Sequence, residues 1–277
     1  MSVHPTLSFE DEAQRTIYEY VECHGAVSPD ELARSIRIDK GPAQSKPARS
    51  GTYSEAVPLS PDELRASVGE LKDAGYLVET DGKLRIALSA APAEHELADG
   101  TVTIRPAREE DREGLIEVMQ SVGSEGTYVV AENVVEQLER EPALVRANDE
   151  RSRVFFVAVF EPESDEEGEE ESTAADEELV GWLHVDAPEL PSLCHTAELT
   201  VGVATDHRRE GIGSALLEYG LEWAGDGYRK VYQSVPATNE QAIEFLEANG
   251  WKREGEREEH YRIDEEFVDE VLFAIWP

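Results

Sequence analysis

A glycine-containing turn stands between a buried strand pattern and an amphipathic helix pattern in the segment 197–217. The turn has the spacing Arg208-x-x-Gly211-x-Gly213. Glycines at the start of a helix let the backbone approach a ligand closely, and the N–H groups of the first turn bind an anion without a side chain. The segment therefore predicts a phosphate or pyrophosphate site at the N-terminus of a helix near 209–225.

Three other interpretations of this turn can be weighed against that prediction. A dinucleotide-binding fingerprint needs a third glycine, and Leu216 occupies its position. A phosphate-binding P-loop ends in Gly-Lys-Ser or Gly-Lys-Thr, and this turn contains no lysine. An ordinary strand–turn–helix with a glycine turn is the non-functional interpretation, and the arginine before the glycines and the alternating strand argue against it.

The turn belongs to a longer succession of strand and helix patterns. The run Val154–Phe160 is too apolar to be half exposed, which predicts a central strand. The acidic run Glu161–Glu178 after it predicts a solvated hairpin loop. The other expected elements are a strand at Thr101–Arg105, a helix from Pro106 to Val122, a helix near 131–140, strands at Leu179–Asp186, 196–203 and Arg229–Val235, a helix at 239–249, and strands near 252–263 and 267–276.

A separate set of patterns precedes these elements. A helix is expected at 11–24, and the sequences that begin at Ser28 and Ser60 each predict another, because a serine cap is followed by proline and acidic residues. The segment 76–86 predicts a hairpin around Asp81-Gly82. Three helices followed by a hairpin are typical of a winged helix-turn-helix domain.

Composition indicates where the domains end. The segment 41–59 is rich in Gly, Pro and Ser and predicts a mobile insertion between the second and third helices. The segment 89–99, rich in Ala, Pro and Glu, predicts a linker. We therefore expect a winged-helix domain over residues 1–88 and a second domain over residues 100–277.

The charge balance is strongly acidic. Acidic residues number 61 against 25 basic ones, of which six are lysine, and the formal net charge is −36. This surplus indicates the very saline cytoplasm of an extreme halophile, because salt screens charge repulsion. The alternative is a nucleic-acid mimic or a disordered acidic protein, and a hydrophobic content of 40% argues against disorder. Cys23 and Cys194 have no metal-binding spacing, and neither a signal peptide nor an apolar run of ~20 residues is present. These features predict a cytoplasmic protein without a metal site or a membrane segment.

The Arg208-x-x-Gly211-x-Gly213 turn resembles motif A of the GNAT superfamily of acetyl-CoA-dependent N-acetyltransferases. A second block at 239–251, N-x-x-A-I-x-F-L followed by N-G-W, resembles the family's second cofactor-contacting helix and the strand after it. The resemblance covers roughly residues 100–277. It implies an α+β protein with a GNAT fold, a mixed and mostly antiparallel central sheet flanked by helices, beside the smaller winged-helix domain.

The resemblance also implies acetyl-CoA as the acyl donor and a primary amine as the acceptor, which attacks directly in a ternary complex. The end of the strand would bind the pantetheine arm and stabilise the oxyanion, and the turn would bind the pyrophosphate through N–H groups and the helix dipole. The cofactor-binding residues implied are Val201, Gly202 and Val203 of the strand, Arg208, Arg209, Glu210, Gly211, Ile212, Gly213 and Ser214 of the turn and helix start, and Asn239.

Acetyl transfer to an amine needs a base, because an alkyl ammonium with a pKa near ~10 is almost wholly charged at neutral pH. Glu198 is the first candidate, since a carboxylate in an apolar strand is costly unless it is used or paired, and pairing with an arginine is its structural alternative. His195 is the second candidate. Many family members have a tyrosine that acts as the general acid seven residues after the asparagine, but Leu246 occupies this position here. Tyr232, Tyr261 or solvent could protonate the thiolate, and the acid stays unassigned.

A second class of function is an acetyl-CoA-sensing DNA-binding regulator with little turnover. DNA binding needs a basic face, whereas residues 1–100 hold 10 basic and 18 acidic side chains. We therefore favour the enzyme. The acceptor amine and the choice between monomer and homodimer stay open.

Overall fold

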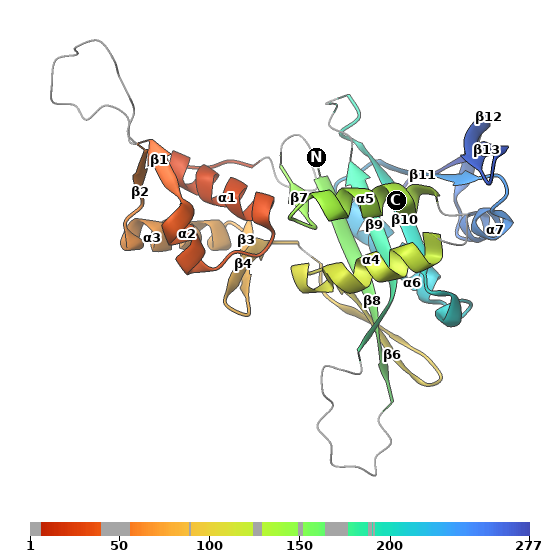
Figure 1. Cartoon of the computed structure of the whole chain (residues 1–277), viewed down its shortest axis with the longest axis horizontal. Coiled ribbons are helices and arrows are strands. Elements are labelled where there is room, and N and C mark those ends of the chain that lie inside the picture. The colour runs from red at the N-terminus through yellow and green to blue at the C-terminus, as the bar shows by residue number, and fades with distance from the viewer. Residues whose placement is uncertain are drawn as a thin grey trace. The chain divides into compact units, whose positions relative to one another are not determined.

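The computed structural model describes residues 7–39, 56–88, 90–123, 129–148, 152–163, 177–187, 190 and 192–277. Contacts divide the chain into two compact units, Leu7–Leu88 and Ser89–Pro277 (Figure 1). No helix in these described ranges is long and apolar enough to cross a membrane.

The first unit contains three helices and two small antiparallel sheets. Its elements are α1 (Glu12–His24), α2 (Pro29–Ser35), β1 (Arg37–Asp39), β2 (Ala56–Pro58), α3 (Pro61–Asp73), β3 (Leu77–Thr80) and β4 (Lys83–Ile86). The Ser28 and Ser60 side chains cap α2 and α3 as predicted. Asp81 and Gly82 join β3 to β4 with φ angles of 53° and 72°, the left-handed conformation that a tight hairpin turn requires. The unit thus has the predicted helices and hairpin.

The predicted insertion at 41–59 needs a correction at its C-terminal end. Residues 56–58 form β2, which pairs with β1 so that Ile38 lies opposite Val57. This pairing of two three-residue strands depends on residues nearly twenty positions apart, and no local pattern announces it. Residues 40–55, the rest of the insertion, lie outside the described residues.

The second unit is built on one mixed sheet. Its strands are β5 (Ala93–Glu96), β6 (Gly100–Pro106), β7 (Arg146–Ala147), β8 (Ser152–Pro162), β9 (Glu178–Ala187), β10 (Thr196–Val203), β11 (Lys230–Pro236), β12 (Lys252–Ile263) and β13 (Glu266–Ile275). The spatial order is β12-β13-β11-β10-β9-β8-β6-β5, with β7 added beside β8. Among the described strands only β10 and β11 pair in parallel. The predicted mixed and mostly antiparallel sheet is therefore confirmed.

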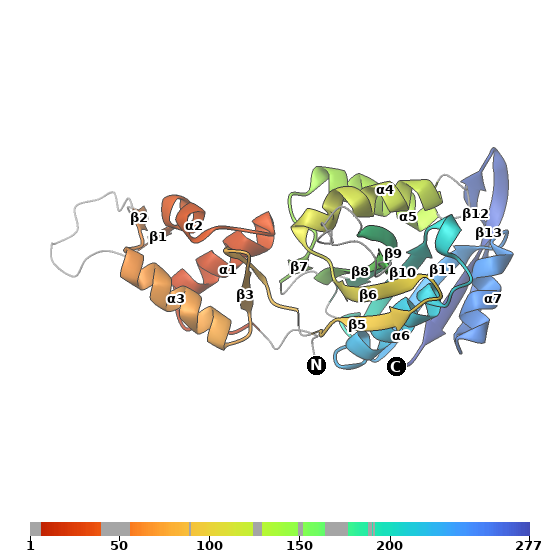
Figure 2. The same cartoon turned by 90° about the horizontal axis from the view of Figure 1, so that it is seen from below.

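Helices cover both faces of this sheet (Figure 2). On one face lie α4 (Arg112–Gly123) and α5 (Val129–Arg140), and on the other lie α6 (Ile212–Gly225) and α7 (Glu240–Ala248). Leu115, Met119 and Leu138 of the first pair pack with Phe155 and Trp182 of the sheet. Short helical turns, η1 (Glu109–Asp111) and η2 (Thr205–His207), precede α4 and α6.

Two expectations for this unit differ from the structure. The linker predicted at 89–99 contains β5, whose backbone pairs with β6 although its side chains are mostly exposed, so no hydrophobic pattern marks it. The helix predicted to begin at Pro106 begins at Arg112. Asp111 forms a 2.7 Å ion pair with Arg105 and accepts from the N–H of Arg108, which fixes a turn before the helix.

Candidate functional site

The site begins where two neighbouring strands separate. β10 pairs with β9 from Glu198 to Val203, but its pairing with β11 ends at Glu198 opposite Tyr232. β11 nevertheless stays paired with β13 as far as Pro236. A cavity of about 530 Å³ occupies the gap, and its walls include residues 200–203 of β10 and residues 233–236 of β11. The two strands are therefore splayed apart at their C-terminal ends.

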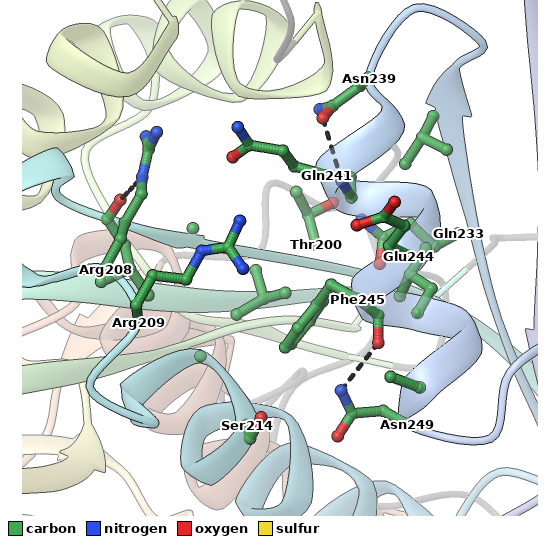
Figure 3. Close-up of a pocket in the computed structure, with 18 of the residues that line it drawn as sticks. Thr200, Arg208, Arg209, Ser214, Gln233, Asn239, Gln241, Glu244, Phe245 and Asn249 are labelled. Atoms are coloured by element: carbon green, nitrogen blue, oxygen red, sulfur yellow. Dashed lines mark hydrogen bonds between the residues drawn. The ribbon is translucent and has the colours of Figure 1, made fainter.

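The start of α6 forms one end of this cavity (Figure 3). Gly211 is the N-cap residue with φ of 89°, and no side chain caps the helix. The first helical hydrogen bond runs from the N–H of Ala215 to Gly211, so the preceding N–H groups of the first turn have no acceptor within the helix. Gly213 and Ser214 of that turn line the cavity. This helix start can therefore bind an anion through its backbone.

Two consecutive arginines shape the turn before α6. The Nε of Arg208 donates to the carbonyl of Val203 at 3.0 Å, which ties the turn to the end of β10. Arg209 has a φ of 71°, unusual for a residue other than glycine, and its exposed side chain extends toward the middle of the cavity (Figure 3). The cation that lies over the cavity thus adds to the positive end of the helix dipole.

Two of the predicted cofactor-binding residues do not line the cavity. Ile212 is 1% exposed and packs in the core beneath the helix start. The carbonyl of Glu210 lies 3.1 Å from Nε2 of His95, and its carboxylate lies 3.5 Å from Nδ1 of His207. The other predicted positions, Val201, Gly202, Val203, Arg208, Arg209, Gly211, Gly213, Ser214 and Asn239, are among the lining residues.

The start of α7 forms the opposite wall. Asn239 is buried, and its Oδ1 accepts from the N–H of Ala242 at 3.1 Å, so its side chain caps α7. Phe245 and Leu246 of the same helix also line the cavity. Leu246, at the position where a tyrosine was expected from the resemblance, is 1% exposed and cannot donate a proton.

The two predicted catalytic residues lie at the other end of β10. His195 is exposed, and its carbonyl accepts from the backbone N–H groups of Arg229 and Lys230. Glu198 is half-buried and lies opposite Asp186 on one side and Tyr232 on the other. Burial raises the pKa of its carboxyl, and the charges of Asp186 and Glu270 raise it further. Neither residue is among those that line the cavity.

A hydrogen-bonded chain leads from the cavity to a buried carboxylate, and the sequence did not predict it. Ser234 lines the cavity, and its Oγ lies 3.2 Å from the hydroxyl oxygen of Tyr261. Tyr261 donates at 2.7 Å to Glu270, which is 3% exposed and forms a 2.8 Å ion pair with Arg257. Because Tyr261 has one proton and gives it to Glu270, the Ser234 hydroxyl is the donor in its hydrogen bond with Tyr261.

The same chain bears on the missing acid. Burial raises the pKa of Tyr261 to about 12, and burial together with Glu198 and Asp186 raises that of Tyr232 to about 12. A phenol with such a pKa is a poor proton donor to a thiolate, whose conjugate acid has a pKa of ~8.5. The raised pKa values make both tyrosines weaker acids than a free phenol, and neither is among the residues that line the cavity.

The described residues contain no group of three metal-ligating side chains. The arrangement offers an anion site at α6 and a gap between two strands, with the carboxylates of Glu198 and Asp186 at the end of β10 that lies away from this gap. This combination suits an elongated ligand with a phosphate end.

Comparison with known proteins agrees with this geometry. Residues 133–251, which contain β10, α6, β11 and α7, match the model of the acetyltransferase (GNAT) family. A search of curated proteins finds no match.

Solved structures are similar to the chain at low sequence identity. A GNAT-family acetyltransferase from Streptococcus pneumoniae is 20% identical with a TM-score of 0.49, and the match covers 64% of this chain and 99% of that one. A GCN5-related N-acetyltransferase from Kribbella flavida is 20% identical with a TM-score of 0.49, and the match covers 64% of this chain and 98% of that one. A Salmonella typhimurium protein solved with its cofactor acetyl-CoA is 16% identical with a TM-score of 0.47, and the match covers 63% of this chain and 93% of that one. The second unit of this chain thus contains a segment, residues 133–251, that matches the acetyltransferase (GNAT) family model, and this segment lies in a mixed, mostly antiparallel sheet.

Proposed function

We propose that this chain transfers an acetyl group from acetyl-CoA to a primary amine, by direct attack of the amine in a ternary complex. The observation that carries the proposal is the cavity between β10 and β11, which the α6 start closes at one end. The N–H groups at 212–214 and the Arg209 guanidinium would hold the pyrophosphate. Acetyl-CoA would supply the activated acetyl group as a thioester.

The strand end at Val201–Val203 would hold the pantetheine arm. Pairing of β10 with β11 stops at Glu198, so backbone groups on the β11 side of this strand end are available to a ligand. An N–H there would stabilise the oxyanion that forms during transfer. Asn239 would contact the arm from the α7 side, where its side chain already lines the cavity.

Carboxylates near the reaction centre suit a cationic acceptor. Asp186, Glu198 and Glu270 are close enough for the first and last to raise the pKa of Glu198. That raised pKa brings Glu198 closer to the range in which a general base works at neutral pH, and His195 is the second candidate. The lone pairs of Ser234 would accept an N–H of the amine, since its own proton is directed to Tyr261.

The thiolate would take its proton from solvent. Leu246 has no proton to give, and Tyr232 and Tyr261 hold theirs too tightly. A thiol with a pKa of ~8.5 leaves as a reasonably stable anion, so the reaction does not require a side-chain acid.

The described face of α3 argues against the DNA-binding regulator. If the first unit is a winged-helix domain, as its element order supports, α3 is the helix that would enter a groove. Its two basic residues, Arg65 and Lys72, are outnumbered by the acidic residues Asp62, Glu63, Glu70 and Asp73 of the same helix. Contact with phosphates needs a basic face. We propose that the first unit contacts protein or substrate, in the saline cytoplasm that the net charge of −36 suits.

Calorimetric titration of the full chain with acetyl-CoA and with CoA, in concentrated KCl, tests the proposal. Micromolar binding, followed by thiol release when primary amines are added, supports an N-acetyltransferase. Binding without thiol release for any amine would favour a sensor, and failure of the folded protein to bind either ligand would overturn the cofactor assignment. Retention on DNA or heparin at the lowest salt that the fold tolerates would revive the regulator.

A further inference from the structure

One residue of the cavity wall breaks an otherwise apolar row. Val231 and Val235 of β11 are fully or almost fully buried, and Gln233 lies between them on the same face of the strand. Gln233 is itself only 8% exposed and lines the cavity (Figure 3). In the described part of the chain its Oε1 is buried and has no hydrogen-bond partner.

A buried acceptor without a partner lowers stability, because it has lost its hydrogen bonds to water and gained none. Among the described residues, the indole nitrogens of Trp182 and Trp251 are also buried without a hydrogen-bond partner, but neither tryptophan lines the cavity. A ligand in the cavity could therefore donate the hydrogen bond that Oε1 of Gln233 lacks. That occupant must bring a donor to the wall formed by β11.

The surroundings of Gln233 narrow the choice of donor. Val201 across the gap and Phe245 and Leu246 of α7 are apolar, whereas Gln241 and Glu244 of α7 add polar side chains to the wall of the same cavity. A secondary amide on a mostly apolar chain suits such a mixed wall, and the anion-binding start of α6 is a different part of it. The pantetheine arm of CoA is such a chain.

We infer that Oε1 of Gln233 accepts a hydrogen bond from an amide N–H of the pantetheine arm, which makes Gln233 a residue that recognises this arm by its side chain. The inference rests on the proposed function, since it takes CoA as the occupant. It assigns to β11 a contact separate from the phosphate site at α6.

Two ligands and two variants test the inference. The ligands are CoA and 3′-phosphoadenosine 5′-diphosphate, which carries the nucleotide and phosphates of CoA without the arm. The variant Gln233→Met keeps the length of the side chain and removes the amide. Gln120→Met, an exposed glutamine of α4 outside the cavity, is the matched control. Calorimetry gives the affinities, and a thermal melt of the free protein gives the unfolding midpoint.

The expected result is a loss of about fivefold to tenfold in CoA affinity for Gln233→Met, with the affinity for the nucleotide unchanged. The unfolding midpoint of the ligand-free variant should rise by about 3 °C, because the unsatisfied acceptor is gone. A residue with a purely structural role would lower the midpoint instead. Gln120→Met should change neither quantity.

Each other outcome speaks against the inference in a recognisable way. Unchanged CoA affinity, an equal loss for both ligands, or a lower midpoint would overturn it while leaving the cofactor assignment intact. A parent protein that binds the nucleotide as tightly as CoA would show that the arm has no site. If the parent binds neither ligand, the proposed function fails and this inference fails with it.

Discussion

Two helices, α6 and α7, begin at the same cavity, and the backbone N–H groups at their starts are capped differently. The start of α7 is capped by its own side chain, because Oδ1 of Asn239 accepts from Ala242. The start of α6 has glycine at the N-cap, no side-chain cap, and an arginine beside it. A helix start whose N–H groups are satisfied internally has less to offer an anion. The difference supports the proposal that the α6 start, rather than the α7 start, holds the phosphates.

The largest effect on CoA affinity is expected from a negative charge at the α6 start. A Cβ at Gly213 would lie 3.6 Å from Phe245 and from Val203, so the fold accommodates a side chain there. Gly213→Asp would place a carboxylate against the pyrophosphate and weaken CoA binding by about a hundredfold or more. Calorimetry measures the affinity. The same charge favours the helix dipole, so the melting temperature should not fall.

Gly213→Ala is the matched control, since it adds the Cβ without the charge. It should bind CoA within about threefold of the parent. If the alanine variant loses as much affinity as the aspartate variant, space rather than charge explains the effect. If neither loses affinity, α6 is not the phosphate site.

A smaller effect is expected from Arg209. Arg209→Ala removes the exposed cation over the cavity, and CoA affinity should fall about fivefold. The loss should shrink as the KCl concentration rises, because salt screens an exposed charge. Arg229→Ala, an exposed arginine outside the cavity, should leave the affinity unchanged. A loss that does not depend on salt would show that Arg209 acts through the conformation of the turn.

The α7 start should respond mainly in stability. Asn239→Ala removes the cap and should lower the free energy of unfolding by about 1 kcal/mol, with only a twofold to threefold loss of CoA affinity. Asn239→Ser retains a capping oxygen and should recover most of the stability. Denaturant unfolding and calorimetry on both variants measure the two quantities. A loss of affinity as large as that of Gly213→Asp would remove the distinction between the two helices.

The two helix starts also differ in how far the sequence predicts them. The glycine spacing of the α6 turn has a local cause, since only glycine adopts a φ of 89° at no cost, and so the pattern marks the turn directly. β10 was likewise predicted at its observed bounds, because its buried pattern is continuous. The place of Gln233 in the cavity wall and the hydrogen bond of Ser234 with Tyr261 depend on how β11 pairs with β13 and β13 with β12, and no local pattern encodes such contacts.

Backbone pairing also explains why the sequence did not predict β2, β5 and the separation of β10 from β11. β5 and β2 join sheets through main-chain hydrogen bonds that any side chain permits, so their sequences resemble a linker and a loop. The separation of β10 from β11 depends on where a parallel pairing stops, which is a property of the whole sheet. The sequence could identify the residues near the cavity but not the cavity.

The substitution Glu198→Gln should leave CoA affinity unchanged, because Glu198 lies at the end of β10 that is paired with β11, away from both helix starts. Glu198→Gln should instead lower the turnover of an amine by about a hundredfold at neutral pH. The deficit should close as the pH approaches the amine's own pKa near ~10, where the free amine needs no base. If His195→Asn carries this pH-dependent loss instead, His195 is the base.

Stability supplies an independent check on Glu198. The folded state raises the pKa of this carboxyl through burial and through Asp186 and Glu270, so folding binds its proton more tightly than the unfolded chain does. That contribution is present in full below the ordinary pKa of ~4.3 and is lost as the pH rises through the raised value.

At pH 8 the parent therefore carries a desolvated charge that Glu198→Gln lacks. The variant should be more stable there, and the difference should disappear near pH 4. Denaturant unfolding at both pH values measures it. A variant that is less stable at pH 8 would show that the carboxylate is held by a favourable contact, and Glu198 would then be structural.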